Sequence, residues 1–133
     1  MVPMQVITLI GEDGRPVCER CEVADSPLER LRGLLGRDGL PDDTAMLLRP
    51  CSSIHTSFLR FPIDAVFLDR DFRVVDVVSK LRPWRAAWRC GAHAVLELPA
   101  GAAARRGVAK GDRLAWGAPS RWGPIPRSSW GSA

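Results

Sequence analysis

Apolar and polar residues alternate through most of the first two dozen positions, which is the period of a half-buried β-strand. Residues 4–10 alternate and are rich in β-branched side chains, the polar segment GEDGR follows, and residues 17–24 resume the alternation. A short Gly- and Asp-containing segment between two such runs favours a tight turn. This part of the chain therefore predicts a β-hairpin.

The next segment, SPLERLRGLLG at residues 26–36, has the period and the end signals of a helix. Ser26 is a suitable N-cap, Pro27 fits the first helical position, Glu29 completes a capping box and Gly36 is a stop signal. Its inner face would carry four leucines: Leu28, Leu31, Leu34 and Leu35. A short amphipathic helix is predicted here.

Short apolar runs dominate the rest of the chain. TAMLLRP predicts a buried strand that ends at Pro50, and residues 63–68 and 73–79 flank the turn DRDF as a second hairpin. The apolar residues of that hairpin are nearly continuous, as expected for central strands packed on both faces. Residues 94–98 and 113–116 read as further strands, and PAGAAARRG between them as a turn or a one-turn helix.

The elements add up to six to eight short strands and one helix, without a βαβ rhythm or an internal repeat. The predicted fold class is mainly β: a small sandwich or barrel with one short α-helix. We expect residues 1–116 to form a single domain. Residues 117–133 are rich in Gly, Pro and Ser without periodicity and predict a flexible C-terminal tail.

Composition narrows the class of partner. The chain has 133 residues and a formal charge of +4, with seventeen arginines against two lysines. This bias, together with many Ala and Gly, indicates a high-GC bacterial genome. The basic residues are scattered among fifteen acids, so a dedicated nucleic-acid-binding stripe is absent and a nucleic-acid partner is not expected.

No apolar run is long enough to span a membrane, and the N-terminus lacks the pattern of a signal peptide. The sequence therefore predicts a cytoplasmic protein without a membrane span. Four cysteines in such a chain are expected to be reduced thiols.

Three blocks in order resemble one family: ERLRGLLGR, then IHTSFLRFPIDAVFLDRDFRVVDVV, then VLELPAGAAARRGVAKGDRL. Together they are similar to the bacterial and archaeal DUF192 family. The resemblance implies a jelly-roll-like β fold and no assigned activity. The positions that match the family pattern are Arg30, Gly33, Leu34, Pro62, Ile63, Asp64, Glu97, Gly101, Gly111 and Asp112. Methionines common in the family are replaced here by Leu35 and Leu59, which conserves volume but loses the thioether.

The segment CSSIHTSFLRFPIDAVF, residues 51–67, concentrates polar groups beside a buried strand. Asp64 needs an arginine or several backbone N–H donors if it is buried, so it is either a structural carboxylate or part of a cleft. We predict a site for a small polar or anionic ligand that needs no cofactor. Its residues would be His55, Thr56, Arg60, Asp64, Arg30 and Arg32.

Whether a reaction is catalysed stays open. His55 and Asp64 could act as a base and its orienting group, but their spacing does not require it. No serine lies in a G-x-S-x-G elbow, so a hydrolase triad has no support.

The cysteines offer an alternative function, a zinc- or redox-dependent module. Cys18 and Cys21 form one C-x-x-C pair, and Cys90 and His93 form a second pair with ligand-like spacing. Cys51 and His55 are a third candidate pair. Against zinc, a two-residue gap in a regular strand would point Cys18 and Cys21 to opposite faces.

A second alternative is a protein-interaction adaptor that uses RPWRAAWRC. If this segment is helical, Trp84 and Trp88 share one face and Arg85 and Arg89 the next. Such a patch could meet a protein, a phosphate backbone or an anionic membrane surface. Otherwise the two tryptophans would cap the open end of the β core.

Overall fold

The structure is a computed structural model that describes residues 5–12, 14–24, 37–41 and 44–117. It is mainly β, with one short helix in the part that it describes. The strands are β1 (Gln5–Gly11), β2 (Pro16–Ala24), β3 (Thr44–Leu48), β4 (Ser53–His55), β5 (Ile63–Leu68), β6 (Val74–Leu81), β7 (Ala86–Trp88), β8 (Ala94–Pro99) and β9 (Leu114–Gly117), and the helix is α2 (Ala102–Arg105).

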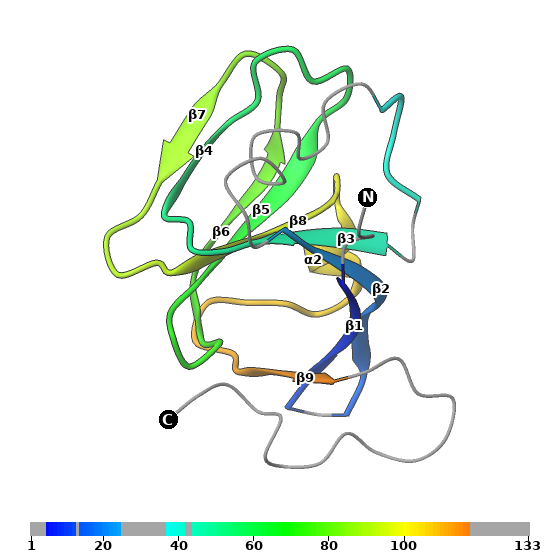
Figure 1. Ribbon diagram of the computed structural model, residues 1–133, viewed down its shortest axis with the longest axis vertical. Coiled ribbons are helices and arrows are strands. Elements are labelled where there is room, and N and C mark those ends of the chain that lie inside the picture. Colours follow the sequence, from blue (N-terminus) through cyan, green and yellow to red (C-terminus); the bar gives the residue numbers. More distant parts are fainter. Residues whose placement is uncertain (1–4, 13, 25–36, 42–43, 118–133) are drawn as a thin grey trace.

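Seven strands form one sheet in the order β6-β5-β8-β3-β2-β1-β9, and β4 and β7 form a separate two-stranded ribbon (Figure 1). Only β2 and β3 run parallel, and every other neighbouring pair is antiparallel. The two edge strands meet at one corner, where Arg73 pairs with Arg113 and the Val74 N–H donates to the Asp112 carbonyl at 2.7 Å. The sheet therefore curls into a half-barrel whose open edges touch at that corner.

Each face of this sheet buries a core of its own. The inner face includes Leu96 and Leu98 of β8 and packs against α2 through Ala102 and Ala103. The outer face carries a second cluster of buried side chains. In it, side chains of β4, of β7 and of the loop after β4 lie against β3, β5 and β8. Because both faces are covered, every residue of β5 and of β8 is buried.

The predicted strands are confirmed. The N-terminal hairpin is β1–β2, TAMLLRP contains β3, DRDF joins β5 to β6, and PAGAAARRG contains the one-turn helix α2. One expectation for the second hairpin needs correction. β5 is a central strand, but β6 lies at the edge of the sheet and most of its residues are only partly buried.

The segment RPWRAAWRC is not helical. Residues 86–88 form β7, and Trp84 lies before that strand with a positive φ of 63°. Trp84 and Trp88 are also not caps of the core, since both side chains are largely exposed. The helical reading failed because the pairing of β7 with β4 outweighs the helix propensity of the Ala-Ala pair.

An irregularity in β2 places two cysteines on the same face. Ile7 and Leu9 of β1 are two residues apart, but their partners in β2, Cys21 and Cys18, are three apart. β2 therefore contains one extra residue, a β-bulge, and Glu19 and Arg20 within it are exposed. The expectation that Cys18 and Cys21 face opposite ways is wrong, because the bulge resets the alternation.

The predicted helix at residues 26–36 and the predicted tail, apart from Gly117 in β9, lie outside the described residues. In the described part of the chain, no helix is long and apolar enough to cross a membrane.

Candidate functional site

The residues predicted to hold a ligand lie in different environments. His55 is exposed at the end of β4, and Arg60 is exposed in the loop before β5. Arg60 Nη1 lies 2.7 Å from Asp38 Oδ1, but both side chains are mostly in solvent, so this ion pair contributes little stability. It does link the loop before β5 to residues 37–41.

Thr56 is fully buried, and its polar groups are used inside the protein. Its hydroxyl lies 2.6 Å from the Arg82 carbonyl and accepts the Arg85 N–H at 2.8 Å. Its backbone N–H donates to the Arg85 carbonyl, and its carbonyl accepts the N–H groups of Leu59 and Trp84. Thr56 therefore joins the loops at residues 56–60 and 82–85 and has no donor left for a ligand.

Asp64 has no exposed surface, and three backbone N–H groups satisfy its carboxylate. Oδ1 accepts from Lys80 at 2.8 Å and from Gly101 at 3.0 Å, and Oδ2 accepts from Ala103 at 2.9 Å. Gly101 and Ala103 begin α2, whose N-cap residue contributes no side-chain hydrogen bond of its own. Asp64 of β5 therefore caps this helix from a distant part of the chain.

Among the described residues of the predicted set, Asp64 and the loop at residues 56–60 lie on different sides of the sheet. Asp64 alternates with residues whose side chains join the outer cluster, so its carboxylate points to the inner face and to α2. Leu59, between Thr56 and Arg60, packs in the outer cluster on the other side of the sheet. Arg30 and Arg32 lie outside the described residues.

The four residues of the zinc alternative are also not assembled. Cys18 and Cys21 are buried in the inner core, Cys90 is exposed beyond β7, and His93 lies just before β8. In the described residues, no group of three or more His, Cys, Asp and Glu side chains could hold a metal ion. A hydrogen bond with the Cys18 side chain, followed by burial, raises the pKa of Cys21 well above its ordinary value. Cys21 therefore remains a thiol, unlike the exposed thiolate of a redox-active motif.

One buried acid stands out that the predicted site omitted. Glu97 is in the middle of β8, and only 6% of its surface is exposed. No hydrogen bond to its carboxyl group is formed by the residues that the structure describes. Burial raises the pKa of Glu97 from the ordinary 4.5 to about 7, and the nearby positive charge of Arg37 opposes this shift.

Glu97 belongs to a row of side chains that crosses the outer face of the sheet. It is flanked in sequence by inner-core residues, so its own side chain points outward. Its neighbours across the strands are Met46 of β3 and Ala65 of β5, both in the outer cluster, and Met46 is in turn paired with Glu22 of β2. Glu22 and Glu97 are therefore two strands apart on one face, roughly 10 Å between backbones.

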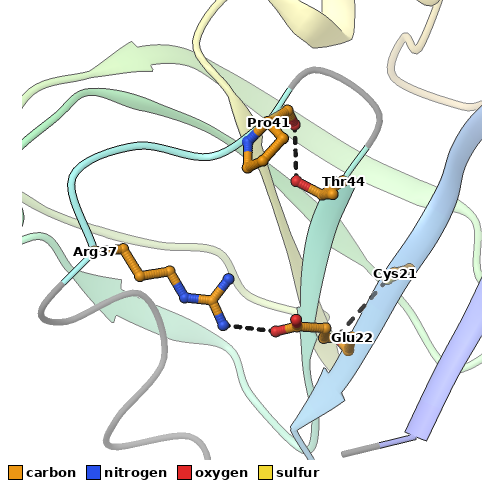
Figure 2. Close-up of polar contacts among 5 residues, drawn as sticks. All are labelled: Cys21, Glu22, Arg37, Pro41 and Thr44. Carbon is orange, nitrogen blue, oxygen red and sulfur yellow. Dashed lines mark hydrogen bonds and ion pairs between the residues drawn. The ribbon is translucent and has the colours of Figure 1, made fainter.

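Arg37 interacts with both of these acids, through an ion pair with Glu22 and through its charge near Glu97. Figure 2 shows its side chain reaching from the segment before β3 toward β2, where Nη2 lies 2.7 Å from Glu22 Oε2. About one third of each of these two side chains is exposed. The same segment is fixed at its end, where the Thr44 hydroxyl donates to the Pro41 carbonyl at 2.7 Å (Figure 2). We call Glu22, Arg37 and Glu97 the outer-face cluster.

The chemistry of the outer-face cluster is that of a polar binding site. A guanidinium has five N–H donors in one plane, and Arg37 uses one of them on Glu22. Beside it, Glu97 changes between a neutral and a charged state near pH 7. Buried groups with such shifted pKa values are concentrated at functional sites.

A separate cavity of about 200 Å³ lies between the end of β1, the end of α2 and the start of β9. Arg106 lines it, with Nη1 donating to the Val17 carbonyl at 2.6 Å, while Nη2 is buried without a hydrogen-bond partner. Glu12 and Asp112 also line this cavity, and each accepts a backbone N–H. This cavity therefore also has a guanidinium and two carboxylates in its lining, and none of them belongs to the outer-face cluster.

The fold and the cluster define a small, curled β domain with a buried, titratable carboxyl group on its outer face. Residues 8–116 match the model of the DUF192 family, described as an "Uncharacterized ACR". The chain belongs to this family, and the resemblance found in the sequence is confirmed.

Relatives and solved structures agree with this assignment. UPF0127 proteins of Pyrococcus horikoshii and Thermococcus sibiricus are 34% and 32% identical, over 71% and 80% of this chain and 84% and 72% of their own lengths. A crystal structure of a Novosphingobium aromaticivorans protein of unknown function superposes with a TM-score of 0.72 at 28% identity, covering 84% of each chain. A Sinorhizobium meliloti protein, for which a role as a transcription regulator has been suggested, gives 0.74 at 27% identity, covering 86% of this chain and 95% of its own.

The sequence did contain a signal for Glu97. It is the single charge in the apolar run AVLELP, and a charge inside a strand that is buried on both faces needs an explanation. The signal for Arg37 was weaker, because its partner Glu22 is fifteen residues away and on another element.

We expect the Asp64→Asn variant to be less stable by about 2–4 kcal/mol, because an amide nitrogen would replace one acceptor oxygen and face a backbone N–H donor. Urea unfolding followed by circular dichroism measures this. Asp71→Asn, on an exposed turn, is the matched control and should change stability by less than about 0.5 kcal/mol. Equal stability of the two variants would contradict the capping role of Asp64.

Glu97 should make the protein less stable as the pH rises. The unfolded chain releases this proton near pH 4.5 and the folded protein near 7, so between these values the folded state binds more protons. Stability is then lost as pH rises through this window, by roughly 3 kcal/mol in total, with no further loss above it. The Glu97→Gln variant, neutral throughout, should gain about this amount at pH 8 and little at pH 4.

Urea unfolding of both proteins at a series of pH values measures this difference. If the difference between the two free energies of unfolding stays the same from pH 4 to pH 8, the pKa of Glu97 is the same in the folded and the unfolded protein, which would contradict this prediction.

Proposed function

We propose that this protein is a binding domain for a small polar or anionic ligand, held at the outer-face cluster. The observation that carries the proposal is Glu97, a residue only 6% exposed, whose pKa burial raises to about 7 and whose carboxyl group receives no hydrogen bond from any described residue. A largely buried carboxyl group holds its proton more tightly than one in water, and in its neutral form it can donate a hydrogen bond to a ligand.

The cluster favours a ligand with an anionic group. The planar donors of Arg37 suit a carboxylate or an oxyanion, and only one of these donors is bonded to Glu22. A neutral Glu97 can donate its O–H to the same ligand, whereas a charged Glu97 would repel it. Binding of the anion and of a proton to Glu97 should therefore favour each other.

The proposed site lies next to Arg60, which the sequence also predicts as a site residue, but its acid is a different residue. Arg60 contacts Asp38, the residue after Arg37, so it is next to the segment that carries the guanidinium. Asp64 is replaced by Glu97 as the acid of the site, because the hydrogen bonds of Asp64 are all made within the fold.

Sulfate and acetate are suitable probes, because neither changes its charge between pH 6 and pH 8. We expect at least one of them to raise the melting temperature, and its affinity by calorimetry to be roughly tenfold weaker at pH 8 than at pH 6. In the Glu97→Gln variant this pH dependence should vanish. In the Arg37→Gln variant the binding itself should be lost.

The Arg106→Gln variant is the matched control, because it removes a guanidinium from the other cavity and leaves the cluster intact. Binding that survives Arg37→Gln but not Arg106→Gln would overturn the proposal and assign the ligand to that cavity. Wild-type protein that binds neither probe at either pH would also contradict it.

A further inference from the structure

Three large apolar side chains are strongly exposed in the described part of the chain, and two of them touch. Phe58, Trp84 and Trp88 are 69%, 59% and 66% exposed. The rings of Phe58 and Trp84 meet edge to face with centroids 4.6 Å apart. Single exposed apolar residues need no explanation, whereas contiguous exposed apolar surface is characteristic of interaction sites.

The backbone holds this pair in a costly conformation. Phe58 and Trp84 have φ values of 68° and 63°, in the left-handed region that bulky residues avoid. Thr56, through its hydrogen bonds to the Arg85 backbone and to the Trp84 N–H, fixes the two loops against each other. Strained residues that the surrounding structure enforces are concentrated where they serve a function.

The two loops and the strand residues next to them are basic. Residues 51–62 and 80–89 contain five lysine and arginine side chains and no carboxylate. Arg60 and Arg89 are paired with Asp38 and Asp76. The other three, Lys80, Arg82 and Arg85, are exposed and form no ion pair with an acid of the described residues.

The β4–β5 connection, residues 56–62, and the β6–β7 connection, residues 82–85, lie together at one end of the long axis of the molecule, at the top of Figure 1. Exposed aromatic rings with exposed cations from the same two connections are the combination that suits the boundary of an anionic bilayer. There the rings enter the headgroup region and the cations meet lipid phosphates.

We propose that the aromatic tip, formed by Phe58 and Trp84 with Lys80, Arg82 and Arg85, binds the surface of anionic membranes. The occupant is an anionic lipid surface because three cations without an acidic partner among the described residues lie on or beside the loops that carry two exposed aromatic rings, and lipid phosphates would supply the opposite charge. This function is independent of the ligand bound at the outer-face cluster.

Co-sedimentation of the full-length protein with vesicles tests the proposal. We expect binding to phosphatidylcholine vesicles that contain phosphatidylglycerol, little binding to phosphatidylcholine alone, and release at high salt. The Phe58→Asn/Trp84→Asn variant should bind at least roughly tenfold more weakly. Because Asn tolerates positive φ better than an aromatic residue, its melting temperature should equal or exceed that of the wild type.

A charge-matched pair of variants separates the tip from the net charge. Arg82→Gln/Arg85→Gln should weaken vesicle binding by roughly tenfold or more, because each cation at an anionic surface contributes a few-fold in affinity. Arg20→Gln/Lys110→Gln removes the same charge from exposed positions outside the two loops and should bind like the wild type.

Equal losses in the two charge variants would overturn the proposal in favour of non-specific attraction. Wild-type protein that stays in the supernatant at low salt would also overturn it. If the wild type does not bind vesicles but self-associates, and the Phe58→Asn/Trp84→Asn variant does not self-associate, the tip is a contact between copies of the chain.

Discussion

Burial of both faces of one sheet is the constraint on which this structure depends. The inner face packs on α2, and the β4–β7 ribbon covers part of the outer face, so the central strands β5 and β8 have no solvent side. Any polar side chain on these strands must obtain its hydrogen bonds within the protein or remain without them. Asp64 and Glu97 are the two acids on these strands. Only Asp64 accepts hydrogen bonds from described residues.

Asp64 uses its burial to organise the fold. Its three backbone donors come from β6 and from the start of α2, so one carboxylate connects a sheet edge to the helix under the sheet. Glu97 has no such donors among the described residues, and its pKa shifts to about 7 as a consequence. One acid therefore contributes stability, whereas the other reduces stability at neutral pH and is available to a ligand or a proton. The proposed function depends on that difference.

Much of the fold could be predicted because strand periodicity and turn residues are local signals. The two hairpins, β3, β8 and α2 were all found in this way. The bulge in β2 and the strand β7 were missed, since a bulge is set by the register with β1 and β7 exists only through its pairing with β4. The site was harder, because side chains that look alike in sequence, such as Asp64 and Glu97, differ only in the donors that other elements bring to them.

The most direct test is to measure the proton affinity of Glu97 itself, by following the carboxyl carbon signals of the folded protein by NMR from acidic to neutral pH. The Glu97→Gln variant assigns the signal. A midpoint near 7 is what the burial of Glu97 predicts. A midpoint at the ordinary 4.5 would mean that Glu97 is hydrated or hydrogen-bonded, and the outer-face cluster would lose the property on which its proposed function rests.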